Sequence, residues 1–230
     1  MRTKALLLTA ALGLASVATS MAQVYSVNVV GYINVPVPAT GFALIANQLN
    51  ASPNNSLNSV LTGNIETESQ VLKFANNNYL ADIYDGSAWV DFNTGAASTT
   101  TVAPGEGFFF YNAGTARSIT LVGEVRIGNN LNVTTPPGQF NLMSSIVPQD
   151  LTLDAASGFP TGAAATENQF ISYNAATQGY NPIKVYDGAQ WVDFDSGATV
   201  PTPSVVVGQG FFFYNAGSAA SVWSRNFNPN

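Results

Sequence analysis

Two identical stretches of eight residues are apolar on both faces of a predicted strand. The sequence GFFFYNAG occupies 107–114 and recurs at 210–217. Successive side chains of a strand point to opposite faces, so Phe108 and Phe110 share one face while Phe109 lies on the other. A strand that is apolar on both faces is typical of a position covered on both sides. We therefore predict that each copy is the folding centre of one repeat.

Short β-branched and aromatic runs predict strands through most of the chain. Leu57, Val60 and Leu61 instead recur at helical spacing, which predicts one or two helical turns capped by Asn54 or Asn55. The fold is therefore expected to be all-β with little helix. The predicted strands lie at 24–35, 42–48, 70–74, 79–84, 89–92 and 117–127.

The sequence around the phenylalanine runs also repeats. YDG at 84–86 and WVDF at 89–92 recur 102 residues later, and the two phenylalanine runs are 103 residues apart. VG at 30–31 matches VG at 122–123 with an offset of only 92 residues. This difference in offset predicts a longer turn at 129–138 in the second copy.

A period near 100 residues is too long for a solenoid repeat and fits domains in tandem. We predict two tandem homologous small β-sandwich or β-barrel units, at 23–121 and 122–230, each with about six or seven strands. The strand at 117–127 is expected to close the first unit and to open the second, which would make the pair rigid.

The first 22 residues have the pattern of a secretory signal peptide. Arg2 and Lys4 precede an apolar run at 5–18, and small residues place the cleavage point after Ala22, with Ala18 as the alternative. That run is shorter than the roughly 20 residues of a membrane-spanning helix, and no later segment is apolar enough to span a bilayer. We therefore expect export to the periplasm, the cell surface or the extracellular space.

Composition narrows the chemistry that is available to the exported chain. Charged residues make up 9% of the sequence, against an average of about 25%. Cleavage leaves five of the seven basic residues against 13 acidic ones, a net charge of −8, which disfavours nucleic acid as a partner. Cys and His are absent, so disulfides, His-dependent catalytic triads and His-ligated metals are excluded. No cofactor is expected.

Five short motifs are distributed along the chain. They are GYINV at 31–35, IANQL at 45–49, PGEGF at 104–108, SSIVPQ at 144–149 and VGQGF at 207–211. As a set, these motifs resemble a family of uncharacterised secreted β-repeat proteins of environmental Gram-negative bacteria. The resemblance covers essentially all of the predicted mature chain. It implies export and a duplicated β fold, and it implies no activity.

The repeated WVDF strands supply the first candidate site. Trp89 and Asp91 are two residues apart and share one face of a strand, as do Trp191 and Asp193. The alternate residues are the more apolar pair and are expected to face the core, which places indole and carboxylate outside. An exposed indole beside a hydrogen-bond acceptor is typical of sugar binding. The alternative is a Trp that packs across strands and a solvated Asp.

The second candidate is a calcium site from Asp85, Asp91 and Asn93, which recurs in the second copy as Asp187, Asp193 and Asp195. Calcium takes six to eight oxygen ligands, and a hairpin would bring these carboxylates close together. Their spacing matches no regular calcium loop. The alternative is that the aspartates at the turns accept hydrogen bonds from the backbone.

Without His and Cys, a pair of carboxylates is the remaining enzymatic chemistry, as in glycosidases. Glu106 is the best candidate acid, but its counterpart in the second copy is Gln209, which does not titrate. The sequence favours a secreted, non-catalytic structural or adhesive protein of the cell surface or extracellular matrix. Its expected partners are polysaccharide or other cell-surface proteins. A carbohydrate-binding module that uses the two Trp–Asp pairs is the second hypothesis, and a carboxylate-based hydrolase is the third.

Overall fold

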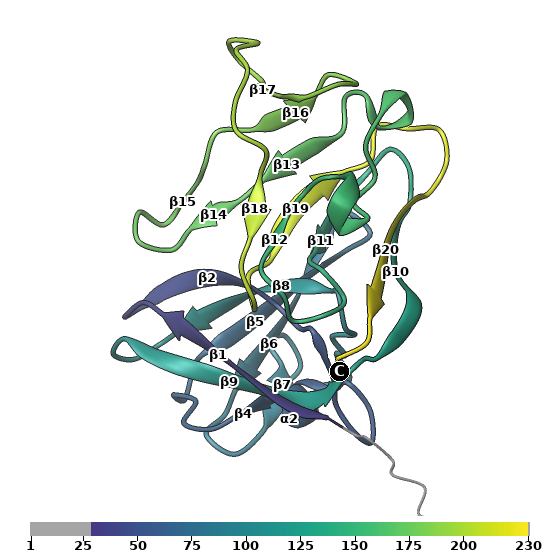
Figure 1. Cartoon of the computed structure of the whole chain (residues 1–230). Coiled ribbons are helices and arrows are strands. Elements are labelled where there is room, and N and C mark those ends of the chain that lie inside the picture. Colours follow the sequence, from purple (N-terminus) through teal and green to yellow (C-terminus); the bar gives the residue numbers. More distant parts are fainter. Residues whose placement is uncertain (1–28, 230) are drawn as a thin grey trace, which may run out of the picture.

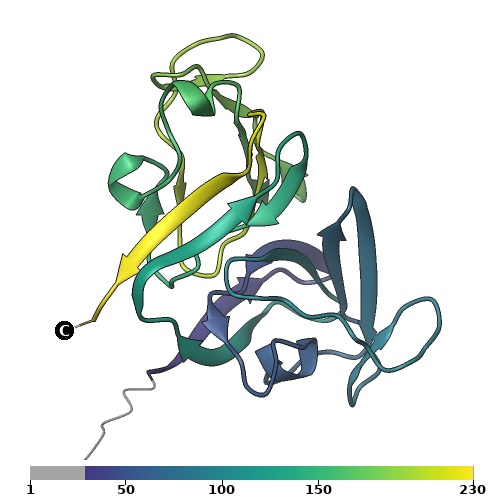
Figure 2. The ribbon, with the colours of Figure 1, turned by 90° about the vertical axis from the view of Figure 1, so that its right-hand side faces the viewer.

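The structure, a computed structural model, describes residues 29–229, so the predicted signal peptide lies outside the described residues. The fold is mostly β, with several antiparallel sheets and little helix, as predicted. We call residues 29–125 the first half and residues 128–229 the second half. The first half forms the lower part of Figure 1, and Figure 2 shows the same pair from the side. Within the described range, no helix is long and apolar enough to cross a membrane.

The first half contains two antiparallel sheets. One has five strands in the order β2-β8-β5-β6-β7, and in the other β9 pairs with β1, β3 and β4. The strands are β1 (Val30–Val37), β2 (Gly41–Ala46), β3 (Leu49–Asn50), β4 (Leu61–Thr62), β5 (Gln70–Ala75), β6 (Asn78–Tyr84), β7 (Trp89–Asp91), β8 (Gly107–Asn112) and β9 (Arg117–Val125). A single core gathers side chains from both sheets, including Ile33 and Leu121 from one and Phe108 and Phe110 from the other.

The predicted helical turn is α2 (Leu57–Val60), and its Leu57 and Val60 are buried. The residue before it is Ser56, so the prediction that Asn54 or Asn55 caps this helix is wrong. The side chains of both asparagines instead accept hydrogen bonds within the segment that precedes the helix. The Asn54 side chain accepts a hydrogen bond from the Ser56 N–H, and the Asn55 side chain accepts one from the Ala51 N–H.

The second half has a five-stranded sheet in the order β11-β19-β13-β16-β17 and three two-stranded sheets, β10-β20, β12-β18 and β14-β15. Its core includes Phe211, Phe213, Trp191 and Trp223. Two short 3₁₀ turns, η1 (Ala155–Ser157) and η2 (Ala163–Ala165), precede the strand β13. The strands are β10 (Gly128–Thr135), β11 (Phe140–Met143), β12 (Leu151–Thr152), β13 (Gln169–Ile171), β14 (Tyr173–Asn174), β15 (Gly179–Tyr180), β16 (Lys184–Tyr186), β17 (Trp191–Asp193), β18 (Ser204–Val205), β19 (Phe211–Tyr214) and β20 (Ser221–Phe227).

The phenylalanine strands are β8 and β19, and they are covered on both faces. Phe108 and Phe110 are fully buried in the core of the first half. Phe109, on the other face, is only 5% exposed and packs with Phe212 of the second half and with two leucines. The Phe109 and Phe212 ring centroids are 6.1 Å apart. The predicted burial of both faces is confirmed, and the second face is covered by the other half.

Backbone hydrogen bonds also join the halves, at two matching places. The Ala46 N–H donates to the Gly208 carbonyl at 2.9 Å, and the Ser144 N–H donates to the Gly105 carbonyl, also at 2.9 Å. The two donors occupy matching positions, since Ala46 is the last residue of β2 and Ser144 directly follows β11. The two acceptors also match, since Gly208 lies in the turn before β19 and Gly105 in the turn before β8. The junction is therefore a continuation of strand pairing as well as a contact between side chains.

Gln48 and Gly210 allow the backbones of the two halves to lie close together at this junction. The buried Gln48 amide donates to the Val147 carbonyl at 3.2 Å and accepts from the Gly208 N–H at 2.9 Å, so both ends of the amide are used across the junction. A Cβ on Gly210 would lie 2.7 Å from the Ile45 carbonyl oxygen. Real Cβ atoms do not come so close, so only glycine lets the two backbones meet here.

The strand predicted to be shared between the units belongs to the first half. β9 pairs with β1, β3 and β4, and the second half begins with a separate strand, β10. The prediction of a shared strand is therefore wrong. The longer turn predicted at 129–138 is also wrong over most of its length, because β10 occupies most of that segment.

The similarity between 30–31 and 122–123 has a different cause from the one predicted. These segments are not equivalent but pair with one another, Gly31 opposite Gly123. A Cβ on Gly31 would lie 2.7 Å from the Leu49 side chain, and one on Gly123 would lie 2.8 Å from the Asn50 carbonyl carbon. Both glycines make room for β3, so steric need explains why glycine stands at both positions.

Candidate functional site

The two WVDF hairpins have the opposite orientation to the one predicted. Trp89 is 1% exposed and Trp191 is 2% exposed, whereas Phe92 and Phe194 are 50% and 55% exposed. The expectation that Phe92 and Phe194 face the core is wrong. The indole is the largest apolar side chain of the strand, and its burial removes the most apolar surface from water. Neither indole therefore presents a face on which a sugar ring can stack.

Aromatic contacts hold each indole in place. The Trp89 ring lies 5.5 Å from the Tyr84 ring and 6.2 Å from the Phe110 ring, centroid to centroid. In the second half the Trp191 ring lies 5.5 Å from the Tyr186 ring. The repeated Tyr and Trp of the sequence are thus a packing pair, which is the alternative that the sequence left open.

Asp91 and Asp193 close the turns that follow the two Trp strands. Asp91 Oδ1 accepts hydrogen bonds from the Thr94 hydroxyl and N–H, both at 2.8 Å. Asp193 Oδ1 accepts from the Ser196 hydroxyl at 2.7 Å and from its N–H at 2.9 Å. Because these bonds favour the charged form, they hold the pKa of both carboxyl groups below its usual range.

Asp85 and Asp187 close the preceding turns in the same way. Asp85 Oδ1 accepts from the Ala88 N–H at 2.8 Å, and Asp187 Oδ1 accepts from the Gln190 N–H at 2.8 Å. These backbone bonds are the largest cause of a lowered pKa in each carboxyl group. Among residues 29–229, no three acidic side chains gather into a group that could hold a metal ion. The structure therefore supports turn closure rather than the calcium arrangement for these aspartates.

Replacing both Asp91 and Asp193 with Asn is expected to make stability less sensitive to acid. The amide retains a side-chain acceptor for the turn but does not titrate. In the wild type the folded pKa lies below the unfolded value of about 3.9, so the unfolded chain binds more protons in acid. Stability present above the unfolded pKa is thus lost as the pH falls through the folded pKa. Melting temperatures between about pH 5 and about pH 2 should fall less in the double variant, and an equal fall would contradict this role.

Glu106, the candidate acid, is also part of a turn. Its Oε2 lies 2.9 Å from Lys73 Nζ and accepts a hydrogen bond from the Ala103 N–H at 2.7 Å. In the second half, Gln209 Oε1 accepts from the Val206 N–H at 3.2 Å in the corresponding turn. Since a neutral amide makes the equivalent bond, what the two turns share is hydrogen bonding rather than acid chemistry.

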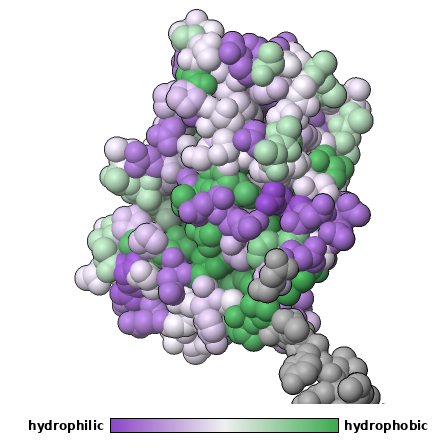
Figure 3. Space-filling model, in the orientation of Figure 1, coloured by the Kyte–Doolittle hydropathy of each residue, from purple (hydrophilic) through white to green (hydrophobic). Residues whose placement is uncertain are grey.

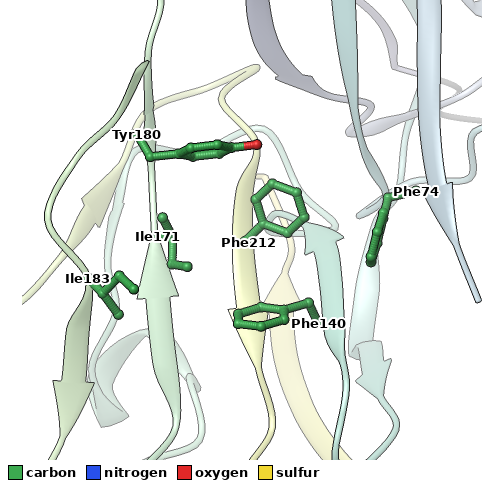
Figure 4. Close-up of a pocket in the computed structure, with 6 residues that line it drawn as sticks. All are labelled: Phe74, Phe140, Ile171, Tyr180, Ile183 and Phe212. Carbon is green, nitrogen blue, oxygen red and sulfur yellow. The ribbon is translucent and has the colours of Figure 1, made fainter. Parts of the chain in front are cut away.

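The cavities with the most aromatic walls lie where the two halves meet. The first aromatic pocket has a volume of about 280 Å³ and is lined by Phe74, Phe140, Ile171, Tyr180, Ile183 and Phe212 (Figure 4). The second aromatic pocket has a volume of about 240 Å³ and is lined by Phe42, Leu72, Tyr79, Phe109, Tyr173 and Tyr180. Tyr180 lines both, so the two pockets adjoin.

Each pocket combines residues of both halves. Phe74 from the first half lines the first aromatic pocket, while Tyr173 and Tyr180 from the second half line the second. Phe74 and Tyr79 pair across one hairpin, and Tyr173 and Tyr180 pair across another. The strands of the first hairpin are predicted at 70–74 and 79–84, whereas the second hairpin is not predicted, and nothing in the sequence reveals that the two face each other. These are the residues that sequence reasoning missed.

The pockets carry no formal charge. None of the lining residues is Asp, Glu, Lys or Arg. Burial, and then the neighbouring Tyr180, raises the pKa of Tyr79 and of Tyr173, so both phenols stay neutral at ordinary pH. Figure 3 shows hydrophobic surface gathered at the junction of the halves and bordered by hydrophilic residues.

A glutamine anchors the second-half hairpin beside the pockets. The Gln178 side chain accepts from the Phe42 N–H at 2.8 Å and donates to the Phe42 carbonyl at 3.0 Å. This two-way bond ties the turn between β14 and β15 to β2 of the first half. It holds Tyr173 and Tyr180 over the junction.

No protein-family model, curated protein or solved structure matches the chain.

Proposed function

We propose that the chain is an exported, non-catalytic structural or adhesive protein made of two tandem homologous small β-sandwich units. The same strand order in the two five-stranded sheets supports the duplication, and so do the matched turns at Asp91 and Asp193. The predicted signal peptide at 1–22 supports export. Because β9 pairs inside the first half, we place the division between the units at 125–128 rather than after 121.

The adhesive role is supported by two exposed phenylalanine rings at matching positions of the two halves. Phe92 and Phe194 follow the same strand in each half, and each is about half exposed. Each ring leaves apolar surface in water, and a partner that covers it would gain the free energy of removing that surface from water. A surface with few charges allows close approach to polysaccharide or to another cell-surface protein.

The test is adsorption of the mature chain to an alginate film and to polystyrene, followed with a quartz crystal microbalance. In Phe92→Ser/Phe194→Ser, each ring should lose on the order of 1 kcal/mol of apolar contact, so affinity should fall roughly tenfold or more. Val206→Ser is the matched control, since Val206 is 54% exposed and lies outside both hairpins. Equal adsorption of the double variant and the wild type would overturn the adhesive proposal.

The other two hypotheses lack a supporting observation. A carbohydrate module would need an aromatic platform other than Trp89 and Trp191, which are buried. A carboxylate-based hydrolase would need a free acid, and Glu106 is held by Lys73 and by its own turn. The structural or adhesive role is therefore the one that the geometry supports best.

A further inference from the structure

The first aromatic pocket has the properties of a binding site for a small molecule. Figure 4 shows Phe140 and Phe212 in the middle, Phe74 on one side, two isoleucines on the other, and the Tyr180 ring crossing one end. Phe74 comes from the first half, and the other lining residues come from the second. The site therefore exists only when the two halves are together.

The rings are fixed around Phe212. The Phe74, Tyr180 and Phe140 ring centroids lie 5.6, 5.9 and 6.2 Å from that of Phe212, and each pair meets edge to face. Phe212 itself is buried, so it forms the floor of the pocket. Such edge-to-face contacts hold the rings at fixed angles to one another. The pocket is thus formed before any ligand arrives.

The Tyr180 side chain lines the pocket but remains largely exposed to solvent. It is 57% exposed although it contacts Phe212 and Phe109. Its strand is short, and the Gln178 anchor keeps the hairpin in place. A ligand that covers Tyr180 would therefore remove apolar surface from water without rearranging the backbone.

The volume of the first aromatic pocket and the polarity of its walls indicate which ligands fit it. A cavity of about 150 Å³ lined by Leu, Ile and Phe takes up benzene, and sites for drug-sized molecules begin near 300 Å³. At about 280 Å³, the first aromatic pocket suits one or two fused rings. Its walls carry no charged group, so an ion would be desolvated there without a partner. We propose that this pocket binds a small uncharged ring compound, aromatic or alicyclic.

This site is independent of the adhesive surface. Phe92 and Phe194 line neither aromatic pocket. Loss of adhesion and loss of ring binding can therefore be separated with different variants of the same chain.

The experiment titrates the mature chain, 23–230, with the uncharged fluorescent probe N-phenyl-1-naphthylamine. Tyr180→Ser removes one wall, and Ile183→Phe fills the pocket from the side of β16. Each should raise the dissociation constant by about tenfold or more, equivalent to the loss of one good ring contact. Phe194→Ser is the control, because its exposed ring lies outside the pocket, and its dissociation constant should not change.

A second measurement keeps the result independent of probe optics. Naphthalene should raise the melting temperature of the wild type and of Phe194→Ser, but not that of Ile183→Phe, because only a ligand bound to the folded state stabilises it. Circular dichroism checks that every variant is folded. The proposal is overturned by non-saturable probe uptake, by equal binding in all variants, or by uptake that appears only where size-exclusion chromatography shows association of chains.

Discussion

Replacing Phe109 with Asp is expected to cost most of the stability of the protein. Phe109 is buried at the junction, against Phe212. Removal of a buried Phe ring alone costs about 3–5 kcal/mol, and a carboxylate in its place adds the cost of an unpaired buried charge. The total free energy of unfolding of a domain is only about 5–15 kcal/mol. Urea unfolding curves should show a large fall in the midpoint, or no folded baseline at all.

The matched control for this prediction is Phe92→Asp. Phe92 is half exposed on the first half, so the same substitution there should change the free energy of unfolding by no more than about 0.5 kcal/mol. Phe212→Asp should behave like Phe109→Asp, because the two rings cover each other. Similar midpoints for Phe109→Asp and Phe92→Asp would show that the junction contributes little to stability.

Local alternation was enough to locate the centre of each half. Phe108 and Phe110 lie on one face of their strand by elementary geometry, and both prove fully buried. The same alternation places Phe109 on the other face but does not say what covers it. That cover comes from Phe212, 103 residues away, and from Leu142, both in the second half. Tertiary contacts of this kind have no signal in a local pattern.

The orientation of the Trp hairpins was predicted wrongly because it was decided by which face of the strand carries more apolar residues. Trp89 and Asp91 share a face, and the more apolar alternate pair was expected inside. Instead the carboxylate stands at the end of β7, where it caps the turn to Thr94, while the indole two residues earlier fills the core. One polar residue at a strand end does not decide the orientation of the whole strand, because a turn can satisfy it.

The aromatic pockets could not be predicted from the sequence, for the same reason that the junction could not. Tyr180 and Phe74 are far apart in the sequence, and each belongs to its own hairpin. The sequence predicts the strands of the first hairpin, at 70–74 and 79–84, but the hairpin that carries Tyr180 was not predicted. Their meeting depends on how the glycine turns at Gly105 and Gly208 receive the opposite backbone. Matching of two copies of one sequence would have suggested a twofold arrangement, but not the face that each copy presents.

The two halves cover each other's apolar sheet faces, and we infer that they fold as one unit. Separation would expose Phe109 and Leu44, each worth about 1.5–3 kcal/mol when buried. It would also leave the Ala46 N–H without the Gly208 carbonyl.

The decisive experiment compares the urea unfolding of residues 23–127 with that of residues 23–230, followed by Trp fluorescence and sedimentation velocity. The first half contains Trp89 as its fluorescent reporter, since the other two tryptophans lie in the second half. We expect the isolated half to have a free energy of unfolding lower by several kcal/mol and to associate as its concentration rises. A monomeric half with the same unfolding midpoint as the whole chain would contradict it.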